Sequence, residues 1–213
     1  MKKYHLITIG CQMNKSDSER MAAVLESQGL KKTDKRKSAD LIVLVTCGVR
    51  QSAEDRIYGL VNQIKKDNQK TKIVLTGCLA GRADVKSRLT EKVDFWVPIG
   101  LISNFQFPIS PSAPLRAGKF QIPKIISKKL NCEYLNIVPK YTSKFSAFVP
   151  IGNGCDNFCS YCVVPYARGR EVYRPVEEII KEVKSLIKKG YKEINLIAQN
   201  VNSYQSKVES RKQ

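Results

Sequence analysis

The sequence predicts an α/β protein in which an N-terminal, doubly wound parallel-sheet domain is followed by the beginning of a second α/β domain. Short apolar runs alternate with amphipathic helical segments over the first hundred residues. This alternation is typical of a parallel sheet with helices on both faces. A proline-rich stretch then interrupts the pattern, and strand and helix signals resume after it. We therefore expect domains at 1–100 and 145–213, joined by a linker at 101–144.

The first predicted elements are a strand, a helix and a second strand. His5–Ile9 is a short apolar run that ends in a glycine and a cysteine. Ser16–Glu19 has the pattern of a capping box, which predicts the start of a helix, and Gly29 is placed to end it. Leu41–Val45 is continuously apolar, as expected of a strand that is buried on both faces.

The same order repeats in the rest of the N-terminal domain. A helix is expected from about Ser52, with one apolar face made of Ile57, Leu60, Val61 and Ile64. Ile73–Leu75 is predicted to be the third strand, a short helix follows it, and Val93–Val97 is predicted to be the fourth strand. These elements complete the expected doubly wound sheet.

The linker and the second domain differ in character. Prolines at 108, 111, 114, 123 and 139 disrupt regular structure, so we expect one short helix at most, and Cys132 lies there without partners at a useful spacing. Phe145–Ile151 then predicts a strand, 175–190 a helix that Gly190 ends, and Ile194–Ile197 another strand. Because one βαβ unit cannot enclose a core, the second domain is expected to be truncated.

Composition narrows the classes of protein. The chain has 213 residues, 42% of them apolar, and a formal charge of +18 from 37 Lys and Arg against 19 Asp and Glu. Such a charge favours a polyanionic partner such as nucleic acid, although a solvated Lys-rich surface is the alternative. No segment reaches the length of a membrane span, and the N-terminus has no cleavage signal. We expect a cytoplasmic protein with no membrane partner.

The densest chemical signal is the loop that contains Cys155, Cys159 and Cys162. Thiolates at this spacing can bind three corners of a [4Fe–4S] cluster and leave one iron open. Seven cysteines in a reducing compartment favour metal ligation over disulfides. The single His in the chain argues against most zinc enzymes, so a zinc protein is the weaker alternative.

A second set of cysteines is spread along the chain. Cys11, Cys47 and Cys78 each directly follow a predicted strand. Because the carboxyl ends of parallel strands lie on one edge of the sheet, where such sheets bind ligands, the three thiols are expected to converge there. They predict a second cluster, against the alternative of three unrelated cysteines at strand ends.

These residues resemble the radical S-adenosylmethionine methylthiotransferases. The matching segments are Gly10–Asn14, Thr46–Arg50, Gly77–Ala80 and Gly154–Pro175. The segments Gln12–Asn14 and Gln199–Tyr204 favour the branch of the family that modifies isopentenyladenosine beside the tRNA anticodon. The branches acting on threonylcarbamoyladenosine or on a ribosomal protein are the alternatives within the family.

The resemblance implies two [4Fe–4S] clusters and S-adenosylmethionine as cofactors. One cluster would cleave S-adenosylmethionine to a radical that removes hydrogen from C2 of the adenine, and the second would supply the sulfur that becomes the methylthio group. This chemistry belongs to cofactors and not to side chains. In the family an aromatic residue at the position of Tyr161 lies near the adenine. Arg168 is expected to bind the cofactor or a tRNA phosphate, or to be an ordinary surface arginine, and Asn200 to bind the cofactor or to cap a turn.

The same resemblance implies partners, and it also shows where this chain differs from the family. The expected partners are the anticodon stem-loop of a tRNA and an electron donor such as flavodoxin or ferredoxin, and the protein is expected to be a monomer. The family's catalytic domain is a partial (βα) barrel of about six units, of which this chain contains only the start, without the RNA-binding domain. An inactive or accessory iron–sulfur or RNA-binding fragment is therefore the alternative function.

Overall fold

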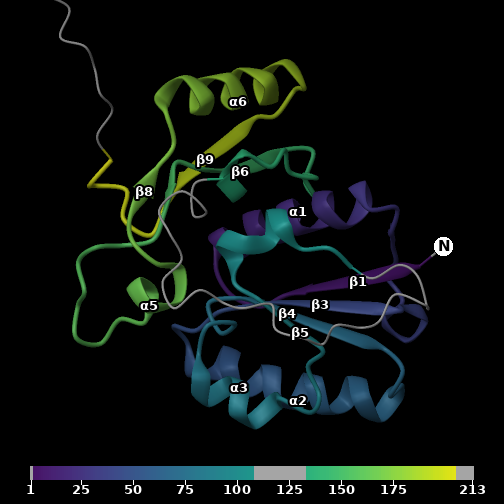
Figure 1. Cartoon of the computed structure of the whole chain (residues 1–213). Coiled ribbons are helices and arrows are strands. Elements are labelled where there is room, and N and C mark those ends of the chain that lie inside the picture. Colours follow the sequence, from purple (N-terminus) through teal and green to yellow (C-terminus); the bar gives the residue numbers. More distant parts are fainter. Residues whose placement is uncertain (1, 108–132, 205–213) are drawn as a thin grey trace, which may run out of the picture.

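The computed structural model describes residues 2–107 and 133–204 (Figure 1). Its N-terminal part is built on a sheet of five parallel strands in the order β2-β1-β3-β4-β5. The strands are β1 (Lys3–Thr8), β2 (Lys31–Lys32), β3 (Leu41–Thr46), β4 (Lys72–Gly77) and β5 (Phe95–Val97). Every residue of β3 is buried, as its continuous apolar sequence predicts for a central parallel strand.

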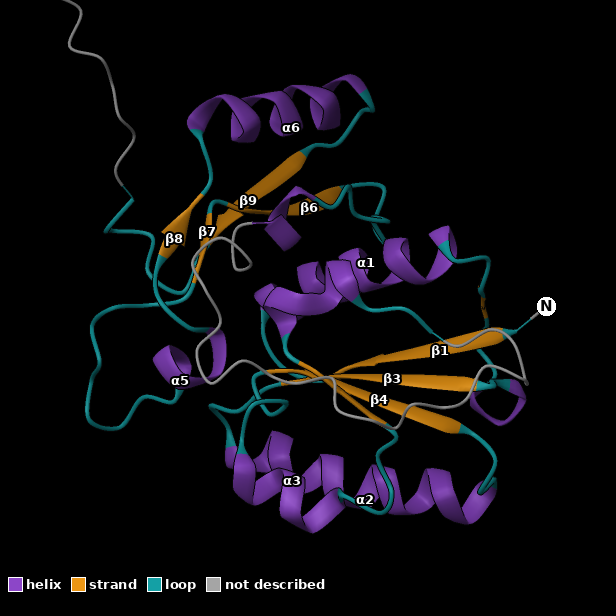
Figure 2. Cartoon of the chain, in the orientation of Figure 1, coloured by secondary structure: helices purple, strands orange, loops and turns teal. Residues whose placement is uncertain are grey.

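Helices cover both faces of this sheet (Figure 2). Helix α1 (Gln12–Ser27) lies on one face, and α2 (Gln51–Asp67) and α3 (Ala83–Leu89) lie on the other. On α2, Ile57, Val61 and Ile64 are buried in the core beneath the sheet, and Leu60 is partly buried against it. The predicted doubly wound α/β fold is confirmed.

The predicted start of the first helix was wrong. The structure begins α1 at Gln12, with Cys11 as its N-cap residue. The side chain of Asn14 turns back to the cap, where its Oδ1 accepts a hydrogen bond from the Cys11 backbone N at 3.4 Å. This interaction serves the first turn of the helix, so Ser16–Glu19 lies within the helix and does not open it.

Two short 3-10 helices continue the layer beside α1. They are η2 (Ile99–Asn104) and η3 (Tyr134–Asn136), and another, η1 (Arg36–Ser38), precedes β3. Tyr134 and Leu135 are buried in the same apolar cluster as Phe105 and Phe107. Much of the expected linker, including Cys132, lies outside the described residues. The part that is described on either side of it packs onto the N-terminal core.

The second part of the chain is a small parallel unit. Strands β6 (Ser146–Pro150) and β9 (Glu193–Ile197) pair in parallel, and helix α6 (Val176–Lys188) connects across them. Between β6 and α6 lie β7 (Gly152–Asn153), α5 (Val164–Arg168) and β8 (Val172–Tyr173), with β7 and β8 antiparallel. The expected strand–loop–helix–strand order is present, with this additional pair of antiparallel strands beside it.

Helix α1 lies between the two parts of the molecule, with the N-terminal sheet on one side and β6 on the other (Figure 1). Its residues Asn14 and Ser16–Arg20 are all buried although all are polar or charged. Met21 and Leu25 pack into the apolar core of the sheet. The helix therefore has an apolar face for the sheet, and its buried charged groups Asp17, Glu19 and Arg20 contact the second part of the chain.

None of the helices within residues 2–107 and 133–204 is both long enough and apolar enough to cross a bilayer.

We expect Asp94→Asn to lower the free energy of unfolding by about 1 kcal/mol at neutral pH, the value of a partly exposed ion pair. Asp94 accepts hydrogen bonds from Lys72 Nζ at 2.8 Å, Lys65 Nζ at 2.9 Å and the Ile73 backbone N at 3.0 Å. Burial opposes the charged carboxylate, but these donors hold the pKa of Asp94 below its ordinary value of 3.8.

A group whose folded pKa is depressed stabilises the fold above its unfolded pKa, and this contribution disappears as the pH falls through the folded pKa. The difference between wild type and Asp94→Asn in urea unfolding should therefore be full near pH 6 and shrink below pH 3.8. The exposed Asp34→Asn is the control. A constant difference across this range would contradict the assignment.

Candidate cluster-binding site

The three cysteines of the N-terminal domain follow three neighbouring strands. Cys11 comes after β1, Cys47 directly after β3, and Cys78 directly after β4. These strands are adjacent and parallel, so their carboxyl ends lie on one edge of the sheet. The predicted placement at strand ends is thus present in the structure, whereas ligation of a cluster stays a prediction.

Glycines beside these cysteines have no Cβ atom, and this lets the backbone segments that carry the cysteines approach one another. A Cβ atom added at Gly10 would lie 2.8 Å from Cys47 Cβ, and one added at Gly48 would lie 3.2 Å from Cys78 Cβ. Cys47 and Cys78 are buried, whereas Cys11 is exposed. The backbone segments that carry the thiols therefore approach one another closely at this edge.

Asn14 fixes the position of Cys11. Its Oδ1 accepts a hydrogen bond from Cys11 Sγ at 3.1 Å, and its Nδ2 donates to the Thr46 carbonyl at 2.8 Å. Asn14 is completely buried, so both halves of its amide are used inside the protein. The side chain thereby ties the first cysteine to the end of the strand that precedes the second.

The loop with the other cysteines runs from β7 to α5. Cys155 and Cys162 are partly buried, and Cys159 is exposed. The Cys155 backbone N donates to the Gly169 carbonyl at 3.3 Å. Gly154 has a φ of +81°, and a Cβ there would lie 2.4 Å from the Arg170 carbonyl oxygen. Only glycine fits at this position, and it brings the start of the loop against residues 169 and 170.

The residues expected to bind the cofactor lie in different surroundings. The side chain of Tyr161 is 90% exposed on the loop. Asn200 lies after β9, where its Nδ2 donates to Ser203 Oγ at 2.5 Å and its backbone carbonyl accepts from Tyr173 Oη at 2.7 Å. Burial and the neighbouring Glu171 raise the pKa of Tyr173 to about 12.

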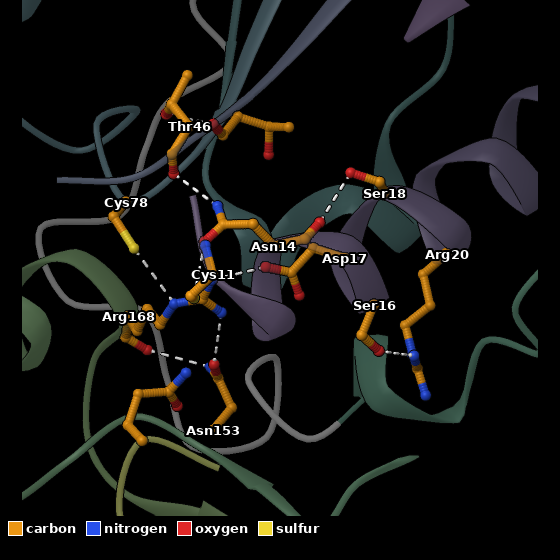
Figure 3. A network of polar contacts seen from close by, with 12 residues as sticks. Cys11, Asn14, Ser16, Asp17, Ser18, Arg20, Thr46, Cys78, Asn153 and Arg168 are labelled. Carbon is orange, nitrogen blue, oxygen red and sulfur yellow. Dashed lines mark hydrogen bonds and ion pairs between the residues drawn. The ribbon is translucent and has the colours of Figure 1, made fainter. Parts of the chain in front are cut away.

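Arg168, whose polar contacts are drawn in Figure 3, is the most buried of the predicted site residues. Its guanidinium contacts Asp17 Oδ2 at 2.6 Å, Asn153 Oδ1 at 3.1 Å and Cys78 Sγ at 3.3 Å. The side chains of Arg168 and Asp17 are 2% and 1% exposed. Burial opposes the charge, but Asp17 and Cys78 beside it raise the pKa of Arg168 above its ordinary value. The assignment of Arg168 as a cofactor-binding residue stays a prediction.

Asp17, Asn153 and Asn14 are functional candidates that the sequence did not reveal. Asn14 belongs to the Gln12–Asn14 segment, whose position after a cysteine was the available signal. Asp17 and Arg168 are 151 residues apart, and no local pattern links them.

Both sets of cysteines have the chemistry that ligation of an iron–sulfur cluster requires. Each set offers three thiols, the ligands that such clusters require, and none of the six is in a disulfide. Across the part of the chain that the structure describes, no three Cys, His, Asp or Glu side chains lie close enough together to hold a single metal ion. The fit therefore rests on the chemistry of the three thiols in each set, and ligation of a cluster by either set stays a prediction.

Comparison with protein families agrees with the two parts of the structure. Residues 3–98 match the model described as "Uncharacterized protein family UPF0004", and residues 149–212 match the radical SAM superfamily. Residues 149–212 are therefore similar to the radical S-adenosylmethionine superfamily, and the segment similar to UPF0004 lies in front of them. The radical SAM superfamily is one that implies a [4Fe–4S] cluster and S-adenosylmethionine.

Individual relatives have a more specific name. The chain is 41% identical to the tRNA-2-methylthio-N(6)-dimethylallyladenosine synthase of Dictyoglomus thermophilum, over 96% of this chain and 46% of the relative. It is 42% identical to the protein of the same name from Thermoanaerobacter sp. (strain X514), over 94% of this chain and 43% of the relative. The chain spans about half the length of the curated relatives it matches.

We expect Gly77→Ala to destabilise the protein by about 2 to 3 kcal/mol, the cost of a strained backbone residue. Gly77 has a φ of +87°, and an added Cβ would lie 2.4 Å from the Thr46 carbonyl oxygen. That carbonyl accepts the hydrogen bond of the Cys78 backbone N at 2.9 Å, so the substitution also displaces Cys78.

Gly59→Ala is the matched control, because Gly59 lies within α2 with no atom within 4 Å of an added Cβ. It should stabilise the protein by about 1 kcal/mol through helix propensity. Thermal unfolding of both variants measures the contrast. Equal effects of the two substitutions would show that the strand end at Cys78 is not constrained as described.

Proposed function

We propose that this protein takes part in tRNA methylthiolation, the addition of a methylthio group to C2 of N6-isopentenyladenosine beside the anticodon, by radical S-adenosylmethionine chemistry. The observation that carries the proposal is the presence of two separate cysteine sets, one at the strand ends of a UPF0004 domain and one on a loop of a radical SAM domain. The names of the relatives support the choice of reaction and substrate.

Each set has a distinct role in this proposal. Cys155, Cys159 and Cys162 would hold the cluster that works with S-adenosylmethionine, and Cys11, Cys47 and Cys78 would hold a second [4Fe–4S] cluster. When bound, such clusters supply electrons for homolytic bond cleavage and sulfur chemistry, which side chains do not provide. Burial of Cys47 and Cys78 would restrict access of water and oxygen to these two ligands, whereas Cys11 and Cys159 are exposed.

Further residues would bind the other components. Tyr161, largely exposed beside the third cysteine of the loop, would contact the adenine of S-adenosylmethionine, and Asn200 its polar groups. The net charge of +18 would attract the anticodon stem-loop of the tRNA. We place the reaction in the cytoplasm, with a monomeric protein and flavodoxin or ferredoxin as the electron donor.

Anaerobic reconstitution with iron and sulfide tests the ligand assignment. Two [4Fe–4S] clusters correspond to about eight iron and about eight sulfide per chain. We expect each triple variant, Cys11→Ala/Cys47→Ala/Cys78→Ala and Cys155→Ala/Cys159→Ala/Cys162→Ala, to retain half of this content with the absorption of the remaining cluster. Zinc without sulfide, or content that neither triple variant changes, would contradict the proposal.

Turnover is measured separately, because it depends on more than cluster binding. Reconstituted protein, a reductant and S-adenosylmethionine are incubated with tRNA that contains isopentenyladenosine, and the nucleosides are then analysed by mass spectrometry. We expect the methylthio nucleoside with wild type and none with either triple variant. Bound clusters without any product would support the alternative of an accessory iron–sulfur fragment.

A further inference from the structure

A single buried guanidinium connects the two parts of the molecule. Arg168, at the end of α5, contacts Asp17 on α1, Asn153 in β7 and Cys78 after β4 (Figure 3). Two of these partners belong to the N-terminal domain and one to the second part of the chain. The backbone carbonyl of Arg168 also accepts a hydrogen bond from Asn153 Nδ2 at 3.3 Å, so this residue pair is bonded in both directions.

The surroundings of Arg168 are those of an internal connector. Its side chain is 2% exposed, so solvent and large ligands do not reach the guanidinium. A buried ion pair stabilises little by itself, since desolvation offsets its attraction, but losing one partner is costly. Its rigid fork of donors can, however, fix several acceptors in one geometry at once. This argues for a role in relative position more than in stability.

The position of Arg168 is transmitted directly to the radical SAM loop. The next residue, Gly169, accepts the hydrogen bond of the Cys155 backbone N at 3.3 Å. Asn153 lies two residues before Cys155, and Gly154 between them donates its backbone N–H to Gln199 Oε1 at 2.7 Å. The first cysteine of the loop is thus held by the same segments that Arg168 joins.

We propose that Arg168 is a positioning residue that sets the placement of the two cysteine sets relative to each other, with one guanidinium bonded to the Cys78 thiol, to Asp17 of α1 and to Asn153 before Cys155. The proposal rests on the proposed function in taking both sets as cluster ligands. In it, the Nε–H of Arg168 bonds to a sulfur ligand of the second cluster, and the remaining nitrogens hold the radical SAM loop against α1.

Three variants separate the parts of this role. Arg168→Lys keeps a positive charge for Asp17 but has no fork with which to bond Cys78 and Asn153 as well. Arg168→Met leaves Asp17 buried without its partner and is expected to destabilise the fold. The double variant Asp17→Leu/Arg168→Met removes both charges and keeps the volume apolar, which such sites often tolerate. Arg36→Met, which breaks an exposed ion pair with Asp67, is the control.

The first readout uses the chain without metal. Alkylation by iodoacetamide is followed at each cysteine by peptide mass spectrometry, with the exposed Cys11 as an internal reference. We expect Cys78 to react about tenfold faster in Arg168→Lys and in the double variant, since local opening controls access to buried groups. Hydrogen exchange should increase at 150–156 in the double variant, and Arg36→Met should match wild type in both measurements.

The second readout uses reconstituted protein and distinguishes positioning from general stability. Hydrogen bonds to ligating sulfurs favour the reduced cluster. Arg168→Lys should therefore lower the midpoint potential of the cluster that the Cys11/Cys47/Cys78 triple variant removes, and leave the other cluster and the unfolding midpoint near wild type. A merely structural arginine would shift the unfolding midpoint without shifting one potential selectively.

The outcomes separate the two proposals. If Cys78 alkylation is unchanged in Arg168→Lys and in the folded double variant, the positioning role is wrong, whatever the clusters do. If wild type binds a single cluster, the two-cluster assignment fails, while the alkylation and hydrogen-exchange results still decide whether Arg168 joins the two parts. An unchanged potential in Arg168→Lys would overturn the bond to the cluster ligand.

Discussion

Parallel pairing of β1, β3 and β4 is the constraint on which the candidate site depends. Parallel strands in register end on the same edge, and here Thr46 pairs with Gly77 at that edge. The residues that follow each strand are consequently neighbours, although 31 positions separate Cys47 from Cys78 in the sequence. The fold therefore gathers thiols from distant segments without any local motif, and the glycines beside them permit the close approach of the backbones.

The second constraint is that α1 packs against two parts of the structure, the N-terminal sheet and the unit that contains β6. A helix that packs against one sheet needs one apolar stripe, and Met21 and Leu25 supply it. The opposite side of α1 is also covered, and there charged groups bond across the boundary. Glu19 Oε1 accepts from both the backbone N and the Oγ1 of Thr142 at 2.8 Å, and Arg20 Nη2 lies 3.8 Å from Glu182 Oε1 on α6.

The sequence was sufficient to predict four of the five strands of the sheet and the placement of Cys11, Cys47 and Cys78 at strand ends, because apolar runs and strand ends are local signals. It did not predict β2 (Lys31–Lys32), which has no apolar residue. The start of α1 could not be read in this way, because Cys11 is an unusual N-cap residue and Ser16–Glu19 imitates a capping box. The packing of Tyr134 was equally hidden, since it lies near prolines with no periodic pattern around it. The partnership of Asp17 with Arg168 depends on the docking of two parts, which no spacing in the sequence encodes.

The polar character of this boundary has a consequence for biosynthesis. Arg168 leaves the ribosome long after the residues of the N-terminal sheet, and domains generally fold in the order in which they are made. Until then the boundary face of α1 presents carboxylates, hydroxyls and a guanidinium to water, and these groups are well hydrated. An apolar face waiting for the same interval would attract chaperones or other nascent chains. Because the two parts dock through ionic groups, the boundary face of the first domain can stay exposed to water without associating with other chains while the second part is translated.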